Sequence, residues 1–330
     1  MSDVRNGVMG LCVGDALGVP VEFSSRQELA RNPVTGMRAY GTYKQPAGTW
    51  SDDTSMTLCL LDSLTRGLDL RDVMERFADW ARQGAYTPFG EAFDIGTGTR
   101  MAIARFLGGT DPLDCGGKGE RDNGNGALMR ILPLLFYLRA TYGQDFAGSI
   151  HADPRIMGTI HDVCRLTHGH RRSQIACGIY VLVADRLSGA GNREAAVREG
   201  LQAAWSWYSA RREFAGELEH YSRLMDPGFA QLPQQKIRSS GYVVDTLEAA
   251  AWCFLRTDNY RDCVLNAVNL GSDTDTVAAV AGGLGGLQYG LEGIPGLWLE
   301  TIVRREFVEK LCQRAQQVWE TGRPMPGDRM

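Results

Sequence analysis

Two acidic motifs stand at the starts of predicted helices, far apart in the chain. The first is Ser51-Asp52-Asp53-Thr54, and an apolar helical pattern follows it. The second is Asp273-Thr274-Asp275-Thr276, which follows Gly271 and Ser272 and precedes another apolar helix. Taken singly, each motif is typical of helix capping, because Ser and Asp side chains accept hydrogen bonds from free N–H groups and suit the helix dipole.

The same carboxylates could instead bind metal ions. Neighbouring carboxylates repel each other unless a cation neutralises them. Hard divalent cations such as Mg²⁺ and Mn²⁺ prefer oxygen ligands of this kind. If the two helix starts converge, their carboxylates and hydroxyls would hold two such ions, which could activate a water molecule. The sequence therefore predicts a centre with two Mg²⁺ or Mn²⁺ ions, provided that the two motifs meet in space.

Two further acidic residues lie near the N-terminus, in the stretch GDALGVPVEF. Asp15 is interpreted either as a solvated polar group or as a hydrogen-bond acceptor at a helix end. Glu22 stands in a short apolar stretch, where an exposed charge is unusual, so both a functional and an ion-paired carboxylate fit its position.

The elements that must position these residues are helices. Apolar residues recur at i, i+3 and i+4 through most of the chain, and period-2 alternation is scarce. We predict an all-α protein, a compact helical bundle in a single domain spanning residues 1–330. The predicted helices are 4–16, 53–65, 72–82, 93–107, 128–138, 156–166, 172–187, 192–208, 243–255, 260–269, 274–287 and 299–318.

Composition narrows the class of protein. The formal net charge is -4 and no basic stripe occurs, so nucleic-acid binding is not expected. The weakly polar stretch 277–290 is Gly-rich and short, which favours a closely packed buried helix over a membrane span. The eight cysteines lie mostly in apolar helical patterns and form no C-x-x-C pair, so we expect buried thiols in a cytoplasmic protein. The oligomeric state stays open, a monomer included.

Six segments together carry a resemblance to a known family. They are GLCVGDALGVPVEF, WSDDTSM, GNGALMR, THGH, SSGYVVDTLEAAAW and NLGSDTDTVAAVAGGLGGLQYG, in that order. In this order they resemble the ADP-ribosylglycohydrolases, in particular the bacterial members that act on dinitrogenase reductase. The resemblance implies a metal-dependent hydrolase that removes ADP-ribose from modified proteins, most often from arginine, and releases ADP-ribose.

The resemblance also implies roles for single acidic residues. The metal ligands would be Ser51, Asp52, Asp53, Asp273, Asp275 and Thr276. Glu22 matches an acidic residue near the metals, and Asp53 would act with it in catalysis. Asp94, in AFDIGTGTR, matches an acidic residue that holds the guanidinium beside the scissile bond. From the residues alone, Asp94 is equally well an acidic residue at a helix N-terminus.

Further positions match family segments that border the nucleotide. These are Asn123, Gly124, Asn125, Gly126, His168, Ser240, Gly241 and Tyr242. The Gly124-Asn125-Gly126 loop opens a predicted helix, and such a start suits a diphosphate, although an ordinary turn is the alternative. The spacing of His161, His168 and His170 allows zinc, but polar or nucleotide contacts fit helix ends better. Tyr242 could stack on adenine or pack in the core.

Other functions stay open at this stage. A two-metal site also suits hydrolysis of a phosphoester or of another ADP-ribosyl compound. A non-catalytic ADP-ribose-binding protein is the third possibility, and the intact set of Asp residues argues against it. Segments 192–235 and 116–123 carry no family motif, so the identity of the modified target is not encoded in a recognisable way.

Overall fold

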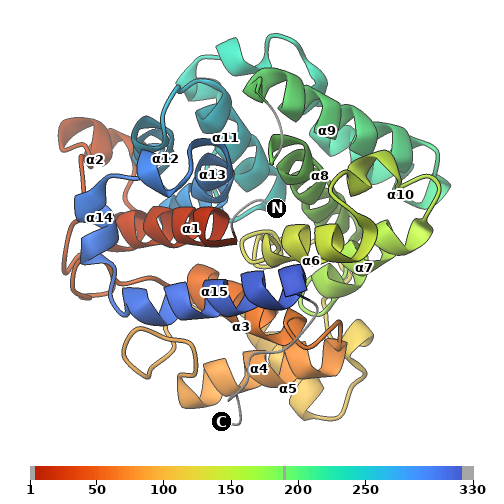
Figure 1. Cartoon of the computed structure of the whole chain (residues 1–330). Coiled ribbons are helices and arrows are strands. Elements are labelled where there is room, and N and C mark those ends of the chain that lie inside the picture. Colours follow the sequence, from red (N-terminus) through yellow and green to blue (C-terminus); the bar gives the residue numbers. More distant parts are fainter. Residues whose placement is uncertain (1–3, 189–190, 322–330) are drawn as a thin grey trace.

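Helices account for the regular structure of the protein in the computed structural model (Figure 1), which describes residues 4–188 and 191–321. Within these residues no strand occurs, and only two isolated β-bridges are present. The predicted all-α class is confirmed. The helices are α1 (Val4–Gly18), α2 (Arg26–Arg31), α3 (Asp52–Leu64), α4 (Leu70–Gln83), α5 (Thr97–Leu107), α6 (Pro133–Tyr142), α7 (Pro154–Arg165), α8 (Arg171–Leu187), α9 (Arg193–Ser209), α10 (Arg212–Leu218), α11 (Val243–Leu255), α12 (Tyr260–Asn269), α13 (Thr274–Tyr289), α14 (Gly296–Thr301) and α15 (Arg305–Thr321).

Two predicted helices differ from the structure, and each difference has a physical cause. The predicted helix 128–138 begins only at Pro133, and residues 126–130 form turns. Proline has no N–H and its ring clashes with the preceding helical turn, so the apolar pattern before Pro133 cannot continue as a helix. The predicted helix 299–318 spans parts of two helices. The helical conformation is interrupted between them, where Arg304 has φ 51°. There the N–H of Val303 bonds to the carbonyl of Gly48 instead of continuing a helix.

A close pair of helices forms the centre of the molecule. The α1 helix lies along α13, although the two are separated by most of the chain (Figure 1). Glycines allow this approach: a Cβ added at Gly10 would lie 2.4 Å from the carbonyl oxygen of Gly282, and one at Gly14 would lie 2.1 Å from that of Ala278. The Gly-rich stretch of α13 is thus a buried helix, as predicted. This packing brings the start of α13 beside the end of α1.

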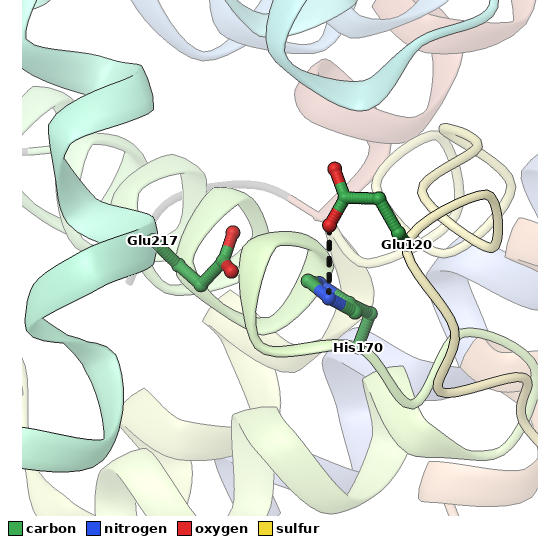
Figure 2. A group of neighbouring side chains, drawn as sticks. All are labelled: Glu120, His170 and Glu217. Atoms are coloured by element: carbon green, nitrogen blue, oxygen red, sulfur yellow. Dashed lines mark ion pairs between the residues drawn. The ribbon is translucent and has the colours of Figure 1, made fainter.

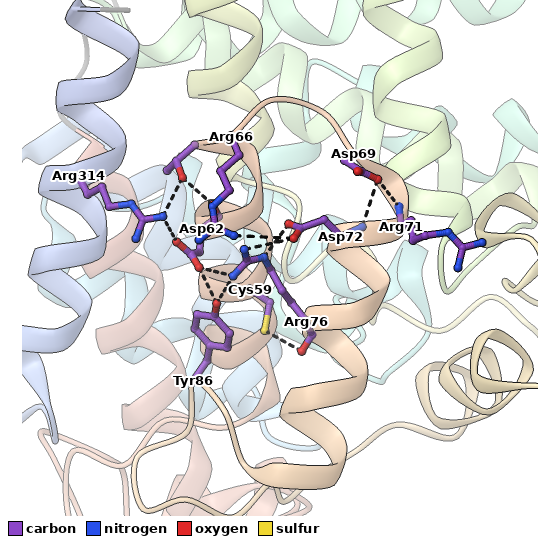
Figure 3. A network of polar contacts seen from close by, with 10 residues as sticks. Cys59, Asp62, Arg66, Asp69, Arg71, Asp72, Arg76, Tyr86 and Arg314 are labelled. Carbon is purple, nitrogen blue, oxygen red and sulfur yellow. Dashed lines mark hydrogen bonds and ion pairs between the residues drawn. The ribbon is translucent and has the colours of Figure 1, made fainter. Parts of the chain in front are cut away.

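A buried ion-pair network ties α3 to its neighbours (Figure 3). Asp62 on α3 is 2% exposed. It forms ion pairs with Arg76 of α4 and with Arg314 of α15, the latter at 2.7 Å. The hydroxyl of Tyr86 donates to the same carboxylate at 2.6 Å. A buried carboxylate needs such partners, because removal from water is costly. The network locks the helix whose first turn carries Asp52 and Asp53.

The remaining sequence expectations on composition concern cysteines and membranes. All eight cysteines are buried free thiols. None of the described helices combines the length and apolar character needed to cross a bilayer.

Candidate active site

The two acidic motifs lie next to each other in the fold. Carboxylate oxygens of Asp53, at the start of α3, and Asp275, at the start of α13, lie with one of Asp15 within 4.8 Å of one another. A second trio, Glu22, Asp94 and Asp275, meets the same limit and shares Asp275. The hydroxyl of Thr276 also reaches Asp53, at 3.3 Å. The convergence on which the metal prediction depends is therefore present in the geometry.

Asp15 caps the first turn of α3 through hydrogen bonds. Its carboxylate, fully buried on α1, accepts hydrogen bonds from the N–H of Ser51 at 2.9 Å and from the N–H of Thr54 at 3.0 Å. It also accepts the hydroxyl of Thr54 at 2.5 Å. Of the two interpretations of Asp15, the hydrogen-bond acceptor at a helix end is correct. Burial raises the pKa of Asp15 to about 6 despite these hydrogen bonds.

Several carboxylate oxygens of the cluster have no partner. Buried oxygens of four residues accept no hydrogen bond: Oε2 of Glu22, Oδ1 of Asp53, Oδ1 of Asp273 and Oδ2 of Asp275. No Lys or Arg among the described residues pairs with these four side chains. Uncompensated buried acceptors are rare in native proteins, because each loses its hydration. The arrangement therefore requires protons or bound cations.

The electrostatic shifts point the same way. Burial, and then the neighbouring carboxylates, raise the pKa values of Asp52, Asp53 and Asp275 well above their usual range. For Glu22, burial and the charge of Asp94 raise the pKa to about 9. Divalent cations bound among these oxygens would supply the missing charge, and an all-oxygen donor set matches Mg²⁺ or Mn²⁺.

Asp94 stands on the irregular segment before α5, not in a helix. The predicted helix 93–107 begins at Thr97, and Asp94 has φ 57°. Asp94 is thus not an acidic residue of a first helical turn, which was its alternative interpretation. Its carboxylate accepts the hydroxyl of Tyr43 at 2.6 Å and faces Glu22. The left-handed backbone turns this carboxylate towards the cluster, where it remains partly exposed to an incoming group.

A pocket of about 410 Å³ opens above the acidic cluster. Ser51, Asp53 and Asp275 are buried and do not line this cavity. The lining residues are Glu22, Phe23, Asp52, Asp94, Gly96, Thr97, Gly98, Thr99, Met101, Arg121, Asp122, Gly124, Asn125, Gly126, Met129, His168, Gly241, Asp273 and Thr276. The volume suits a ligand of nucleotide size.

The start of α5 is the part of this pocket that the sequence analysis missed. Gly96–Thr99 lines the cavity, and the N-cap residue Gly96 provides no side-chain cap, so the first N–H groups of α5 stay available. A Cβ at Gly98 would lie 3.1 Å from Nε2 of His168, so the absence of a side chain here leaves room between α5 and His168. An uncapped helix N-terminus favours anions. The Gly- and Thr-rich sequence Gly96–Thr99 could have indicated this anion-binding helix start.

The Gly124-Asn125-Gly126 loop contributes in a different way from that expected. It lines the pocket but does not open a helix, since residues 126–130 form turns. Asn125 instead connects the pocket to the acidic cluster. Its amide donates to Asp273 at 2.8 Å and to Thr246 at 2.9 Å. The helix start predicted at this loop is thus wrong, and the helix N-terminus that lines the pocket is that of α5.

The remaining predicted nucleotide contacts divide into two groups. His168 and Gly241 line the pocket, and burial followed by the charge of Arg130 lowers the pKa of His168 to about 4, so the imidazole is neutral. Asn123, Ser240 and Tyr242 lie outside the lining. Ser240 donates to Asp245 at 2.6 Å at the start of α11, and the guanidinium of Arg172 lies over the ring of Tyr242.

The three histidines do not share a site. His161 bonds to Tyr208 at 2.9 Å in an aromatic cluster, away from His168. His170 lies beside Glu120 and Glu217 (Figure 2), a grouping with the right types for a metal. However, Arg172 already pairs with both carboxylates, and its N–H donates to Nδ1 of His170. This group is therefore an ion-pair junction, and the acidic cluster is the stronger metal candidate.

Comparison with known proteins agrees with this geometry. A sequence model of the ADP-ribosylglycohydrolase family matches residues 1–324. The chain belongs to the ADP-ribosylglycohydrolase family. It is accordingly a hydrolase, and the resemblance seen in its motifs is confirmed over nearly the whole length.

Individual relatives are also similar to this chain over most of its length. The ADP-ribosylarginine hydrolase Tri1 of Serratia proteamaculans is 32% identical, over 95% of this chain and 79% of that protein. The ADP-ribosyl-[dinitrogen reductase] glycohydrolase of Rhodospirillum rubrum is 32% identical, over 89% and 88%. A solved ADP-ribosylglycohydrolase-related protein complex matches with a TM-score of 0.76 and 32% identity, covering 96% of this chain and 98% of its own.

Proposed function

We propose that this enzyme hydrolyses the bond between ADP-ribose and an arginine side chain of a modified protein, with two Mg²⁺ or Mn²⁺ ions. The observation that carries the proposal is the set of buried, unpartnered carboxylate oxygens of Glu22, Asp53, Asp273 and Asp275, two of which belong to residues that line one pocket. Relatives named for hydrolysis of ADP-ribosylarginine and of ADP-ribosylated dinitrogen reductase support the linkage.

The ligands of the ions would come from both motifs. Asp52 and Asp53, with Ser51, would hold them from α3, and Asp273, Asp275 and Thr276 would hold them from the start of α13. Bound there, the ions would orient the ribose hydroxyls and lower the pKa of an attacking water. Asp52, Asp273 and Thr276 line the pocket, so the ions would lie at the wall where Asp273 stands beside Gly241.

The rest of the pocket suits the ADP part of the substrate. The free N–H groups at the start of α5 and the backbone of Gly124–Gly126 both line the pocket and can bind a diphosphate. His168, being neutral, can contribute a hydrogen bond but no charge. These contacts would fix the distal ribose over the acidic cluster, which supplies much of the rate by orientation.

Two acidic side chains would act on the reacting bond. Cleavage of an N-glycosidic bond develops positive charge on the sugar. Asp94 faces the cluster from the pocket wall and would hold the leaving guanidinium through paired hydrogen bonds. Glu22, with its unpartnered Oε2, would accept the proton of the attacking water, and the departing guanidine would take up one proton to leave as guanidinium. Exclusion of bulk water by the surrounding walls strengthens both interactions.

The test is a release assay with and without chelator. Substrates are peptides with ADP-ribosylated arginine or serine, an ADP-ribosylated nucleic acid and a generic phosphoester. We expect release from arginine alone, abolished by chelator and restored by Mg²⁺ or Mn²⁺. Phosphoester hydrolysis without ADP-ribose release would favour the alternative of another two-metal hydrolase. Binding of ADP-ribose without any turnover would favour a non-catalytic binder.

Two isosteric variants extend the test to the cluster. Asp53→Asn and Asp275→Asn should each reduce metal-dependent release at least about 100-fold, because each removes a charged ligand. Without metal, both variants should melt at a higher temperature than the original enzyme, because one buried repulsion is gone. Loss of activity combined with higher stability excludes misfolding as the cause. Full activity in the double variant would end this proposal.

A further inference from the structure

One cationic side chain reaches the wall of an otherwise acidic pocket. Arg121, on the segment 116–123, is the single Lys or Arg among the residues that line the cavity in the described part of the chain. The other charged lining residues are Glu22, Asp52, Asp94, Asp122 and Asp273. His168 is neutral, so Arg121 is the one positive side chain that a bound anion would meet there.

The segment that carries Arg121 is held firmly. The N–H of Gly169 donates to the carbonyl of Gly117 at 2.8 Å. Farther along, Glu120 pairs at 2.8 Å with Arg172, a 5% exposed residue that also pairs with Glu217 at 2.7 Å (Figure 2 shows the two glutamates). Because Arg172 connects Glu120 to α8 and α10, the backbone that carries Arg121 is held beside the pocket.

Among the charged residues of the segment 116–123, Arg121 is the one without a partner among the described residues. Lys118 pairs with Asp114 at 2.8 Å, away from the pocket. Asp122 accepts the N–H of Gly119 at 2.8 Å and so closes the turn. Arg121 makes no hydrogen bond or ion pair with any described residue, and its guanidinium is available to a ligand.

We propose that Arg121 binds the diphosphate of the ADP-ribosyl substrate and is a main source of ground-state affinity. This inference rests on the proposed function, which places ADP-ribose in the pocket. A diphosphate beside acidic walls is repelled unless a cation offsets that charge, and the metal ions would stand at the far, ribose end. A guanidinium pairs with phosphate oxygens through two parallel hydrogen bonds. The segment 116–123 carries none of the family motifs quoted above, so the resemblance does not by itself imply this contact.

Calorimetric titration of the Mg²⁺-loaded enzyme with ADP-ribose and with adenosine tests the proposal. Arg121→Gln should raise the Kd for ADP-ribose about tenfold at low salt, as expected when a solvent-exposed, charge-assisted contact is lost. The difference should shrink at high salt, because ions screen the pair. Adenosine, which lacks phosphate, should bind both proteins equally. Lys118→Gln is the matched control and should behave as the original enzyme does.

Kinetics supply a second readout. In Arg121→Gln the KM for ADP-ribosylarginine peptide should rise about tenfold while kcat stays unchanged. An unchanged Kd for ADP-ribose, or an equal loss of adenosine affinity, would overturn the assignment of Arg121, as would failure of the original enzyme to bind ADP-ribose. If Arg121-dependent binding is found but no arginine-linked ADP-ribose is released, this inference stands and the proposed function fails.

Discussion

A single methyl group at Gly18 should separate the two helix starts that form the proposed metal site. Gly18 ends α1 in an ordinary helical conformation, with φ -82°, so alanine is permitted by the backbone. A Cβ at this position would lie 2.3 Å from both Cα and the backbone N of Asp275. These are main-chain atoms that cannot rotate away. The start of α13 must therefore move relative to α1.

The size of the effect follows from that distance. Ordinary contact begins near 3.5 Å, so Asp275 must move by about 1 Å. A displacement of about 1 Å in a catalytic constellation can cost on the order of 100-fold in rate. Gly18→Ala should therefore lower kcat/KM for the hydrolysis of ADP-ribosylarginine about 100-fold and weaken Mg²⁺ binding. Overpacking should also lower the free energy of unfolding by about 1–3 kcal/mol.

Gly158→Ala is the matched control. Gly158 lies inside α7, and a Cβ there would meet no atom within 4 Å. This variant should keep full activity and gain about 0.5–1 kcal/mol of stability, because alanine favours a helix more than glycine does. Steady-state kinetics, Mg²⁺ calorimetry and denaturant unfolding check the pair. Wild-type kcat/KM and Mg²⁺ affinity in Gly18→Ala would refute the claim that contact between α1 and α13 positions the cluster.

Two further perturbations probe the charges of the cluster. In chelator, the free energy of unfolding should fall as the pH rises from about 5 to 9, because the folded-state pKa values of Asp15 (about 6) and Glu22 (about 9) exceed their unfolded values and the folded state loses bound protons. Mg²⁺ should flatten this fall, and a melting temperature in chelator that stays level or rises over this range would contradict the electrostatic argument. Asp94→Asn should reduce arginine-linked release about 10–100-fold, since a charged partner of the guanidinium is lost, with Mg²⁺ affinity changed less than threefold. Unchanged release in that variant would remove Asp94 from the reaction.

Local residue patterns predicted much of the secondary structure. Apolar spacing and capping residues located most of the helices within a few residues, since both depend on near neighbours along the chain. The errors have physical causes: Pro133 delays α6, and Arg304 divides α14 from α15 through a bond to a distant loop. The short helices α2 and α10 were missed, because six or seven residues give little periodicity.

The chain by itself determined which carboxylates exist, that they begin two helices, and that they follow a family pattern. Only the tertiary structure decided that Asp15 supports α3 from below, that the left-handed Asp94 faces Glu22, and that the free start of α5 lines the pocket. These relations join segments far apart in sequence. They depend on glycine contacts between α1 and α13 and on the desolvation of the cluster they enclose, and neither can be read from neighbouring residues.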